Sequence, residues 1–213
     1  LKNNIQVIWA RNGEEAVAEI VRVAKEAGAE MLVKSKSMIS EELELNENLG
    51  KNNIEPVETD LGEFIVQVAG EKPYHILTPA MHKSKEDVAD LFERKFHLKP
   101  GSTPQEITLF VRKVLREKFT SAQVGISGAN FLVADVGGIM LTENEGNGFM
   151  SVAFPKVHIA IAGIEKILPS IKHLPLILPL LAVHGTGQQL TVYNSLIPGP
   201  RKPGETNGPE RRV

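Results

Sequence analysis

Cysteine is absent from the 213 residues of the sequence. Its absence excludes disulfides, a cysteine nucleophile, and any metal or iron–sulfur centre held by thiolates within these residues. A chain without disulfides fits the reducing cytoplasm, so a cytoplasmic location is expected. The histidines offer no pair with convincing metal-ligand spacing, so no metal site is predicted.

Long apolar runs and an excess of charge of one sign are also missing. The most apolar stretch, Leu174 to Val183, is too short to cross a membrane and contains Pro175 and Pro179. No transmembrane segment is therefore predicted. The formal net charge is only −2, so no nucleic acid partner is expected. Hydrophobic residues make up 42% of the chain, which is enough for one sizeable core.

The two ends of the sequence indicate a piece of a longer protein. The chain begins with Leu1 rather than methionine, and it ends in PGPRKPGETNGPERRV, in which seven of sixteen residues are proline or glycine. That composition is typical of a linker. We therefore expect one α/β domain over residues 1–197 and a linker over residues 198–213.

Helical and strand patterns alternate along the chain. Apolar spacing predicts helices over about 13–28 and after Ser40, Asp60, Ser84 and Thr103, with capping signals at Asp60 and Thr103. Short apolar runs predict strands at 31–33, 55–58, 74–77, 131–134, 138–141, 157–161 and 190–193. Residues 164–168 begin a short helix, and 174–183 form a helix or loop. This order predicts an α/β fold with a mostly parallel sheet and helices on both faces.

Polar clusters follow five of the predicted strands. They occupy residues 34–37, 59–60, 78–82, 143–147 and 163–166. In open α/β sheets, ligands bind beyond the carboxyl ends of the parallel strands. If these strands are parallel neighbours, the five clusters gather on one rim. Because loops between strands and helices are commonly polar, a solvated surface remains the alternative.

Each cluster has a chemical and a structural interpretation. The four residues of KSKS at 34–37 suit a phosphate or carboxylate ligand, or a solvated loop with a serine cap. Glu143 and Glu145 suit a nucleophile or general base, or a polar turn. The glycines of GISGAN at 125–130 suit backbone approach to an anion, or tight packing. His82 suits ligand contact from a loop, and Lys166 suits an anion or simple exposure.

Five motifs in a fixed order resemble one known family. They are KSKSMISEE (34–42), ETDLGEFIVQ (58–67), HILTPAMH (75–82), GISGANFLVADVGGIMLTENEGN (125–147) and VHIAIAGIEKI (157–167). Together they resemble the LUD domain of lactate-utilisation proteins, most of all the B-type, iron–sulfur subunit of the bacterial L-lactate oxidation system. The resemblance runs from about residue 13 to PGPR at 198–201. It implies a fold similar to the NagB/RpiA/CoA-transferase-like group.

The resemblance also implies cofactors and partners beyond these residues. A complete subunit of this type carries a C-terminal ferredoxin-like region whose cysteines hold [4Fe–4S] clusters, so this chain is expected to bind none. The implied partners are the other lactate-utilisation subunits and a small anionic ligand. One departure from the family is Gly148-Phe149-Met150, where a polar or basic residue is more usual. It puts in doubt an anion contact at that step.

The resemblance supplies motif members for a candidate site. The candidate catalytic residues are Glu143 and Glu145. The candidate ligand-binding residues, with His82 and Lys166 added from their loop positions, are Lys34, Ser35, Lys36, Ser37, Glu41, Asp60, His82, Asn130, Asn144, Asn147 and Lys166.

Three classes of function remain open. The first is a domain of an oxidoreductase assembly that oxidises L-lactate to pyruvate, with lactate, a partner subunit or an unidentified cofactor at its rim. No side chain here carries electrons or hydride, so the domain alone is expected not to oxidise lactate. The alternative is a CoA-transferase-like or sugar-phosphate-processing enzyme that uses a rim glutamate. A non-catalytic scaffold domain is a further alternative.

Overall fold

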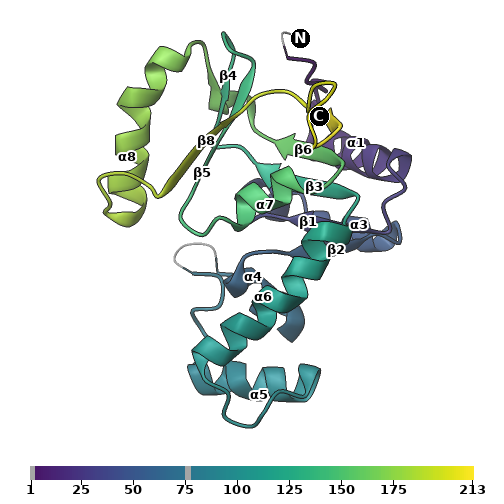
Figure 1. Ribbon diagram of the computed structural model, residues 1–213, viewed down its shortest axis with the longest axis vertical. Coiled ribbons are helices and arrows are strands. Elements are labelled where there is room, and N and C mark those ends of the chain that lie inside the picture. Colours follow the sequence, from purple (N-terminus) through teal and green to yellow (C-terminus); the bar gives the residue numbers. More distant parts are fainter. Residues whose placement is uncertain (1–2, 75–77) are drawn as a thin grey trace.

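The computed structural model describes residues 3–74 and 78–213, which fold into two sheets with surrounding helices (Figure 1). The helices are α1 (Gly13–Glu26), α2 (Met38–Glu42), α3 (Leu45–Lys51), α4 (Leu61–Ala69), α5 (Lys85–Phe96), α6 (Pro104–Ser121), α7 (Asn147–Ala153) and α8 (Leu174–Thr186), with the 3-10 helices η1 (Ile164–Lys166) and η2 (Ile171–His173). The strands are β1 (Met31–Lys34), β2 (Glu55–Glu58), β3 (Val124–Gly128), β4 (Phe131–Val133), β5 (Gly138–Glu143), β6 (Val157–Ile161), β7 (Ile167–Leu168), β8 (Tyr193–Ile197) and β9 (Arg211–Arg212).

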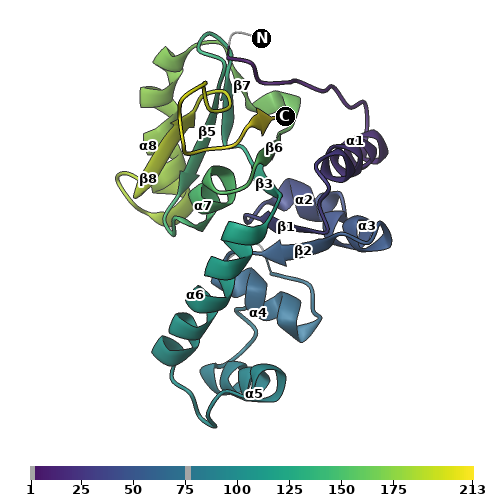
Figure 2. The same cartoon turned by 45° about the vertical axis from the view of Figure 1, so that its right-hand side comes forward.

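The larger sheet is wholly parallel. Its strands lie in the order β2-β1-β3-β6-β9, and Val33 of β1 stands between Val57 of β2 and Gly125 of β3. Helices α1 and α3 lie on one face, and α4, α6 and α7 lie on the other (Figures 1 and 2). This arrangement confirms the predicted α/β fold. Because the strands run the same way, the loops that follow them leave at one edge of the sheet.

Alternate residues of the parallel strands feed a hydrophobic core on each face. Leu32 and Ile126 pack in the cluster that includes α1 and α3, and neither is exposed to solvent. Val33 and Val57 point the other way, into a cluster that includes Phe92 of α5 and other rings of α4 and α6. Fully burying a side chain of this size stabilises the fold by roughly 1.5–3 kcal/mol. The two cores therefore fix the sheet, and with it the positions of the loops at its edge.

The smaller sheet is mixed and lies beside the first. Its order is β7-β4-β5-β8, with β5 antiparallel to both β4 and β8. Leu141 of β5 packs in one cluster with Val152 of α7, and Met140 packs in another with Leu174 of α8. Helices α7 and α8 therefore cover opposite faces of this sheet, as Figure 1 shows.

Strand β3 was not predicted, because its glycines and serine resemble a loop. It is a central strand of the parallel sheet, and Gly125 explains part of its composition. A Cβ atom at Gly125 would lie 1.8 Å from the backbone oxygen of Ser151 in α7. Of the two interpretations of this segment, tight packing of a helix against the strand is the one that the structure supports at Gly125.

The last residues of the predicted linker belong to the sheet. In β9, Arg211 and Arg212 pair in parallel with Val157 and His158 of β6. The backbone N–H of Gln6 donates to the carbonyl oxygen of Arg212 at 3.0 Å, so the two ends of the chain lie side by side (Figure 1). Edge strands need partners of this kind to cover their free backbone groups.

Other element boundaries differ from the prediction in detail. The helix expected after Ser40 is divided between α2 and α3, with Glu44 in a left-handed conformation (φ 47°) at the break. Residues 164–168 form a 3-10 turn followed by strand β7. The final predicted strand lies at 193–197 instead of 190–193. Most of the strand predicted at 74–77 lies outside the described residues.

Candidate functional site

A cavity of about 660 Å³ opens at the edge where the strands of the two sheets end. It is lined by residues 35–39 after β1, Asp60 after β2, 128–131 after β3, 141–145 around the end of β5, 161–163 after β6, and parts of α7 and α8. Four of the five predicted polar clusters contribute to this lining. We call this cavity the rim pocket.

Lys36, Asp60 and Glu145 meet at the rim pocket from three different loops. The Lys36 Nζ atom lies 3.7 Å from Asp60 Oδ2 and 3.9 Å from Glu145 Oε1. Asp60 is held in place because it is also the N-cap of α4, where its side chain accepts from the backbone N–H of Glu63 at 3.1 Å. The ammonium and the two carboxylates are therefore close enough to act on one ligand.

The two predicted catalytic carboxylates have different surroundings. Glu143 accepts hydrogen bonds from the backbone N–H groups of Gly148 at 2.7 Å and Phe149 at 2.6 Å. Its carboxylate therefore serves as a cap for the first turn of α7. Glu145 keeps half of its side chain exposed and contacts Lys36 and the backbone N–H of Asn144. Glu145 is the carboxylate that is better placed to receive a proton from a ligand.

The asparagines of the rim pocket hold its loops together. The Asn130 side-chain oxygen accepts from the backbone N–H of Thr142 at 2.8 Å, and that of Asn144 accepts from Val192 N–H at 3.2 Å. Asn147 Nδ2 donates to Thr59 Oγ1 at 3.4 Å. The first two bonds connect the segments at the ends of β4, β5 and β8, and the third joins α7 to the loop after β2. They leave the amide nitrogens of Asn130 and Asn144 as candidate donors to a ligand.

Ser35 has the least satisfied polar group of the rim pocket. Only 4% of Ser35 is exposed, and its hydroxyl oxygen has no hydrogen-bond partner among the described residues. Ser37 is similarly buried beside Gly128, where an added Cβ atom would lie 2.8 Å from the Ser37 hydroxyl. A buried hydroxyl without a partner costs roughly 1–3 kcal/mol, so the structure retains a group that a ligand would satisfy.

Acidic residues outnumber basic ones around the rim pocket. Five carboxylates line it, and the only lysines in the described lining are Lys36 and Lys166. Lys36 is partly neutralised by Asp60 and Glu145. A ligand with one negative group suits this balance better than one with several, because each further charge meets repulsion from the carboxylates.

Lys34 lies behind the rim pocket rather than in it. Its side chain is fully buried, and its Nζ atom contacts Glu58 Oε1 at 2.9 Å, Glu41 Oε1 at 3.0 Å and Ser40 Oγ at 2.9 Å. Burial alone would lower the pKa of Lys34, but the charges of the nearby glutamates together raise it. Lys34 and Glu41 therefore contact protein atoms and do not line the rim pocket, and their contact with a ligand stays a prediction.

Glu63 completes this buried group. Burial, followed by the charge of Glu58 and a hydrogen bond with it, raises the pKa of Glu63 from 4.5 to about 9. At neutral pH, Glu63 therefore carries a proton and can donate it to Glu58. The cluster of Lys34, Glu41, Glu58 and Glu63 thus joins one buried lysine to three glutamates. Glu58 and Glu63 were not predicted, because nothing in their local pattern shows that they face a lysine from another strand.

His82 lies away from the rim pocket. Its Nε2 atom is 2.6 Å from Glu71 Oε2, and its ring lies 4.9 Å from that of Tyr74. Lys83 also contacts Glu71, at 2.7 Å. His82 therefore belongs to a separate surface contact and does not line the rim pocket, and its role as a ligand contact stays a prediction.

Another buried polar group was missed and anchors the C-terminal strand. Arg212 Nη1 lies 2.7 Å from His158 Nδ1, and His158 Nε2 lies 2.8 Å from Ser127 Oγ. Because arginine only donates, the His158 proton is on Nε2 and points at Ser127. Burial and then the charge of Arg212 lower the pKa of His158 to about 3. His158 is thus a neutral interior histidine.

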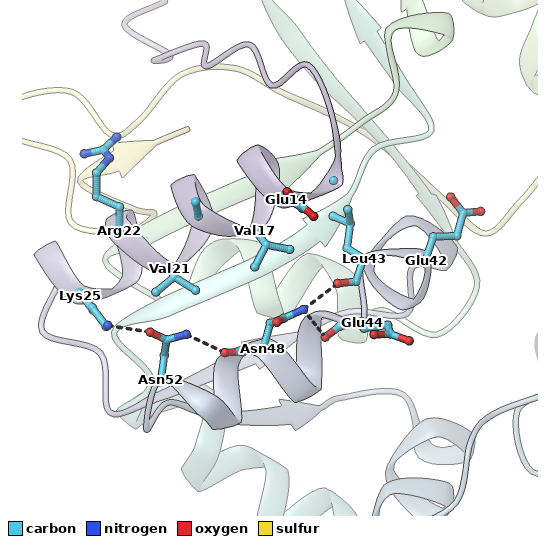
Figure 3. Close-up of a pocket in the computed structure, with 12 residues that line it drawn as sticks. Glu14, Val17, Val21, Arg22, Lys25, Glu42, Leu43, Glu44, Asn48 and Asn52 are labelled. Atoms are coloured by element: carbon cyan, nitrogen blue, oxygen red, sulfur yellow. Dashed lines mark hydrogen bonds between the residues drawn. The ribbon is translucent and has the colours of Figure 1, made fainter.

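A second groove, of about 840 Å³, lies between α1 and the α2–α3 segment (Figure 3). Val17, Val21 and Leu43 line it, and its amides bond to protein atoms. Asn48 donates to the Leu43 carbonyl at 3.1 Å, and Asn52 accepts from Lys25 at 2.7 Å. The groove contains none of the predicted site residues.

The described part of the chain has no side-chain group suited to a metal ion or a cluster. No group of three or more histidine, aspartate or glutamate side chains in residues 3–74 and 78–213 is arranged to hold a metal ion. With no cysteine in the sequence, the residues present do not fit an iron–sulfur cluster. None of the helices described combines the length and the apolar character needed to cross a bilayer.

Comparison with known proteins gives a consistent family. The model of the LUD domain matches residues 1–211. Lactate utilization protein B of Bacillus velezensis is 42% identical over 205 residues, which cover 96% of this chain and 43% of that protein. Its counterpart in Bacillus pumilus is 44% identical over 205 residues, with 96% and 43% covered. The uncharacterized electron transport protein YkgF of Escherichia coli is 40% identical over 209 residues, with 98% and 44% covered.

These relatives are much longer than the chain, which spans less than half of their length. A crystal structure of a DUF162 family protein from Deinococcus radiodurans matches with a TM-score of 0.35 and 14% identity, covering 95% of this chain and 96% of that one. The motif order predicted the family, and the match over residues 1–211 confirms it: this chain belongs to the LUD domain family.

Proposed function

We propose that this chain is the ligand-binding domain of a lactate-utilisation protein that oxidises L-lactate to pyruvate. The observation that supports the proposal is its likeness, along almost its whole length, to proteins named lactate utilization protein B. Partner subunits and [4Fe–4S] clusters outside this chain belong to the same proposal. In it, electrons leave the substrate toward acceptors that these residues do not supply.

The rim pocket offers the groups that a 2-hydroxy acid requires. Lys36 would pair with the lactate carboxylate, and the amides of Asn130 and Asn144 would donate to its oxygens. Oxidation at C2 removes one hydride from carbon and one proton from the hydroxyl. Glu145, half exposed and close to Lys36, is the group we assign to receive that proton. Its neighbour Glu143 remains the cap of α7.

Ligand-dependent stabilisation tests the binding step. At 100 times its Kd, a ligand stabilises a protein by about 2.7 kcal/mol, which raises Tm by roughly 5–10 °C for a domain of this size. We expect L-lactate to produce this shift in the native chain and in Lys25→Met, whose substitution lies in the other groove. Lys36→Met should lose it. An equal shift with chloride or acetate at the same ionic strength would contradict a specific site.

Turnover distinguishes this proposal from the alternatives. Without added subunits or acceptors, the chain should leave L-lactate unoxidised, because it has no group that accepts electrons. Coenzyme A and sugar phosphates belong in the same ligand panel. If only coenzyme A stabilises the chain, and Glu145→Gln abolishes acyl transfer, the lactate proposal fails in favour of a transferase. If no small molecule changes Tm, a scaffold domain is the better description.

A further inference from the structure

Apolar side chains stand exposed beside the rim pocket. Met38 of α2 lines the pocket and is 61% exposed. Ile164 of η1, 73% exposed, is next to Glu165, which lines the pocket. Val192, 61% exposed, donates its backbone N–H to Asn144 of the lining at 3.2 Å. A single exposed apolar residue is ordinary, but three from separate segments beside one pocket indicate a surface that another molecule covers.

Helix α8 extends this apolar surface. Leu176, Leu180 and Val183 are four and three residues apart, so they share one face of the helix, and each is at least half exposed. The helix lies at the outside of the molecule (Figure 1), although it contains no lysine, arginine, aspartate or glutamate. A helix that is apolar all round is ordinarily buried. We call these exposed side chains the apolar border: Met38, Ile164, Leu176, Leu180, Val183 and Val192.

The rim pocket next to this border has an excess of negative charge. Three of its five carboxylates are engaged, since two share Lys36 and one caps α7. The other two, Glu42 and Glu165, are exposed and form no ion pair within residues 3–74 and 78–213. A Cβ atom at Gly163 would lie 2.2 Å from Glu165 Oε2, so the glycine leaves room for this carboxylate beside the pocket. Lys166 is the second lysine of the lining.

The apolar border and the two free carboxylates together indicate the chemistry of a partner. Resting on the proposed function, in which other subunits complete the assembly, we propose that the border and the rim pocket form the docking surface for one of those subunits. The contact region of that subunit is apolar and carries a basic side chain, which reaches Glu42 or Glu165 at the pocket. Arginine suits this role best, because it binds carboxylates in a bidentate manner and is enriched at interfaces.

Charge disfavours the other occupants of this surface. A second copy of the chain would bring its own Glu42 and Glu165 against the same two carboxylates, and like charges in contact are costly. A bilayer surface with anionic lipids would meet the same repulsion, because membrane docking relies on basic side chains. A basic partner is attracted by these carboxylates instead, while its apolar residues cover α8.

Photo-cross-linking in the assembled complex tests the location of the surface. The chain, in its full natural length, is co-expressed with the other subunits of its lactate-utilisation system, with p-benzoylphenylalanine in place of Met38, Ile164 or Leu180. We expect all three positions to cross-link to the same subunit, at a segment with an arginine or lysine among apolar residues. Leu109 is the matched control, because it is exposed and apolar but lies on α6 and lines no part of the rim pocket. It should give no cross-link to that subunit.

Charge reversal tests the basic contact. The affinity for the cross-linked subunit is measured by calorimetry with the native chain and with the double variant Glu42→Lys and Glu165→Lys. The double variant should bind at least about tenfold more weakly, because attraction becomes repulsion. Both side chains are exposed, so its Tm should equal that of the native chain. Glu117→Lys, an exposed substitution on α6, is the control and should bind as the native chain does.

The outcomes separate this inference from the proposed function. Equal affinities of the native chain and the double variant overturn the inference, and so do cross-links to a second copy, within the same chain or at Leu109 alone. If the subunits co-elute with the chain but cross-link elsewhere, the proposed assembly stands and the docking surface is wrong. If the cross-links form as expected but L-lactate does not shift Tm, the docking surface stands and lactate binding fails.

Discussion

Replacing Glu63 by glutamine should change how the stability of the protein depends on pH. Glu63 is buried beside Glu58 at the end of β2, and its pKa is raised from 4.5 to about 9. Glutamine has nearly the shape of the protonated acid and can donate to Glu58 in the same way, but it does not ionise. The substitution therefore removes one titration and keeps the packing.

The sign follows from where the proton is bound. Between pH 4.5 and about 9, folded Glu63 holds a proton that the unfolded chain has lost. Stability due to Glu63 is fully present below the unfolded pKa and is lost as pH rises, by at most about 1.4 kcal/mol per pH unit. From pH 5 to pH 8 the limit is about 4 kcal/mol. Because Glu58 and Lys34 share the titration, we expect about 2–4 kcal/mol.

The difference between the native chain and Glu63→Gln isolates this contribution. His158 acts in the opposite direction, since its folded pKa of about 3 lies below its ordinary 6.5 and its contribution grows as pH rises between those values. Its effect is the same in both proteins and cancels in the difference. The native chain by itself should therefore show little net slope between pH 4.5 and 6.5, and a decline above.

Urea unfolding at closely spaced pH values from 5 to 8.5 is the measurement. The free energy of unfolding of Glu63→Gln should rise relative to the native chain as pH rises, with equal m-values. Glu117→Gln, an exposed substitution on α6, is the control and should run parallel to the native chain. Parallel curves for Glu63→Gln would show that Glu63 is ionised in the folded protein, and the proton assignment in the buried cluster would be wrong.

Three further substitutions test packing and capping, each by chemical denaturation. Gly125→Ala should destabilise the protein by more than about 3 kcal/mol, because the new methyl group would overlap the Ser151 carbonyl at 1.8 Å. Arg212→Leu removes the donor to His158 Nδ1 and should lower the free energy of unfolding by about 2–4 kcal/mol, with faster amide hydrogen exchange in β9. Unchanged hydrogen exchange would contradict the role of Arg212 in holding β9 against β6. Glu143→Ala removes the acceptor of two backbone N–H groups in α7 and should lower the free energy of unfolding by about 1–2 kcal/mol. An unchanged free energy of unfolding would show that Glu143 does not stabilise α7 as a cap.

Features that depend only on residues close together in the sequence were predictable. Asp60 and Thr103 cap their helices through the predicted side chains, because a cap needs only residues three positions apart. The meeting of Lys36 and Asp60 was predictable for a different reason, because they follow the neighbouring parallel strands β1 and β2, whose trailing loops leave at one edge of the sheet. Glu145 follows β5, an antiparallel strand of the smaller sheet, so its place beside them depends on how the two sheets pack and not on strand direction.

Features that depend on distant partners were not predictable. Strand β3 looks like a loop in the sequence because it contains Gly125. That glycine is needed for close packing against α7, a helix more than twenty residues further along the chain. Strand β9 lies in a proline- and glycine-rich segment, and only its pairing with β6 makes it a strand. The burial of Lys34 was not predictable either, because its partners lie far away in the sequence. A lysine in a polar run suggests solvent, and the glutamates that allow its burial lie on α2, β2 and α4.

The buried cluster joins the two strand ends that border the rim pocket. Lys34 is the last residue of β1 and Glu58 the last of β2, so their contact at 2.9 Å clamps the two strands where Ser35 and Asp60 enter the pocket. A buried ion pair gains little over apolar packing in free energy, but it fixes one register of these strand ends. An apolar pair of similar volume would fill the space, but it would allow the loops after β1 and β2 to adopt other conformations. On this reasoning, the cluster contributes chiefly to the placement of the loops, so that its replacement should alter ligand binding more than global stability.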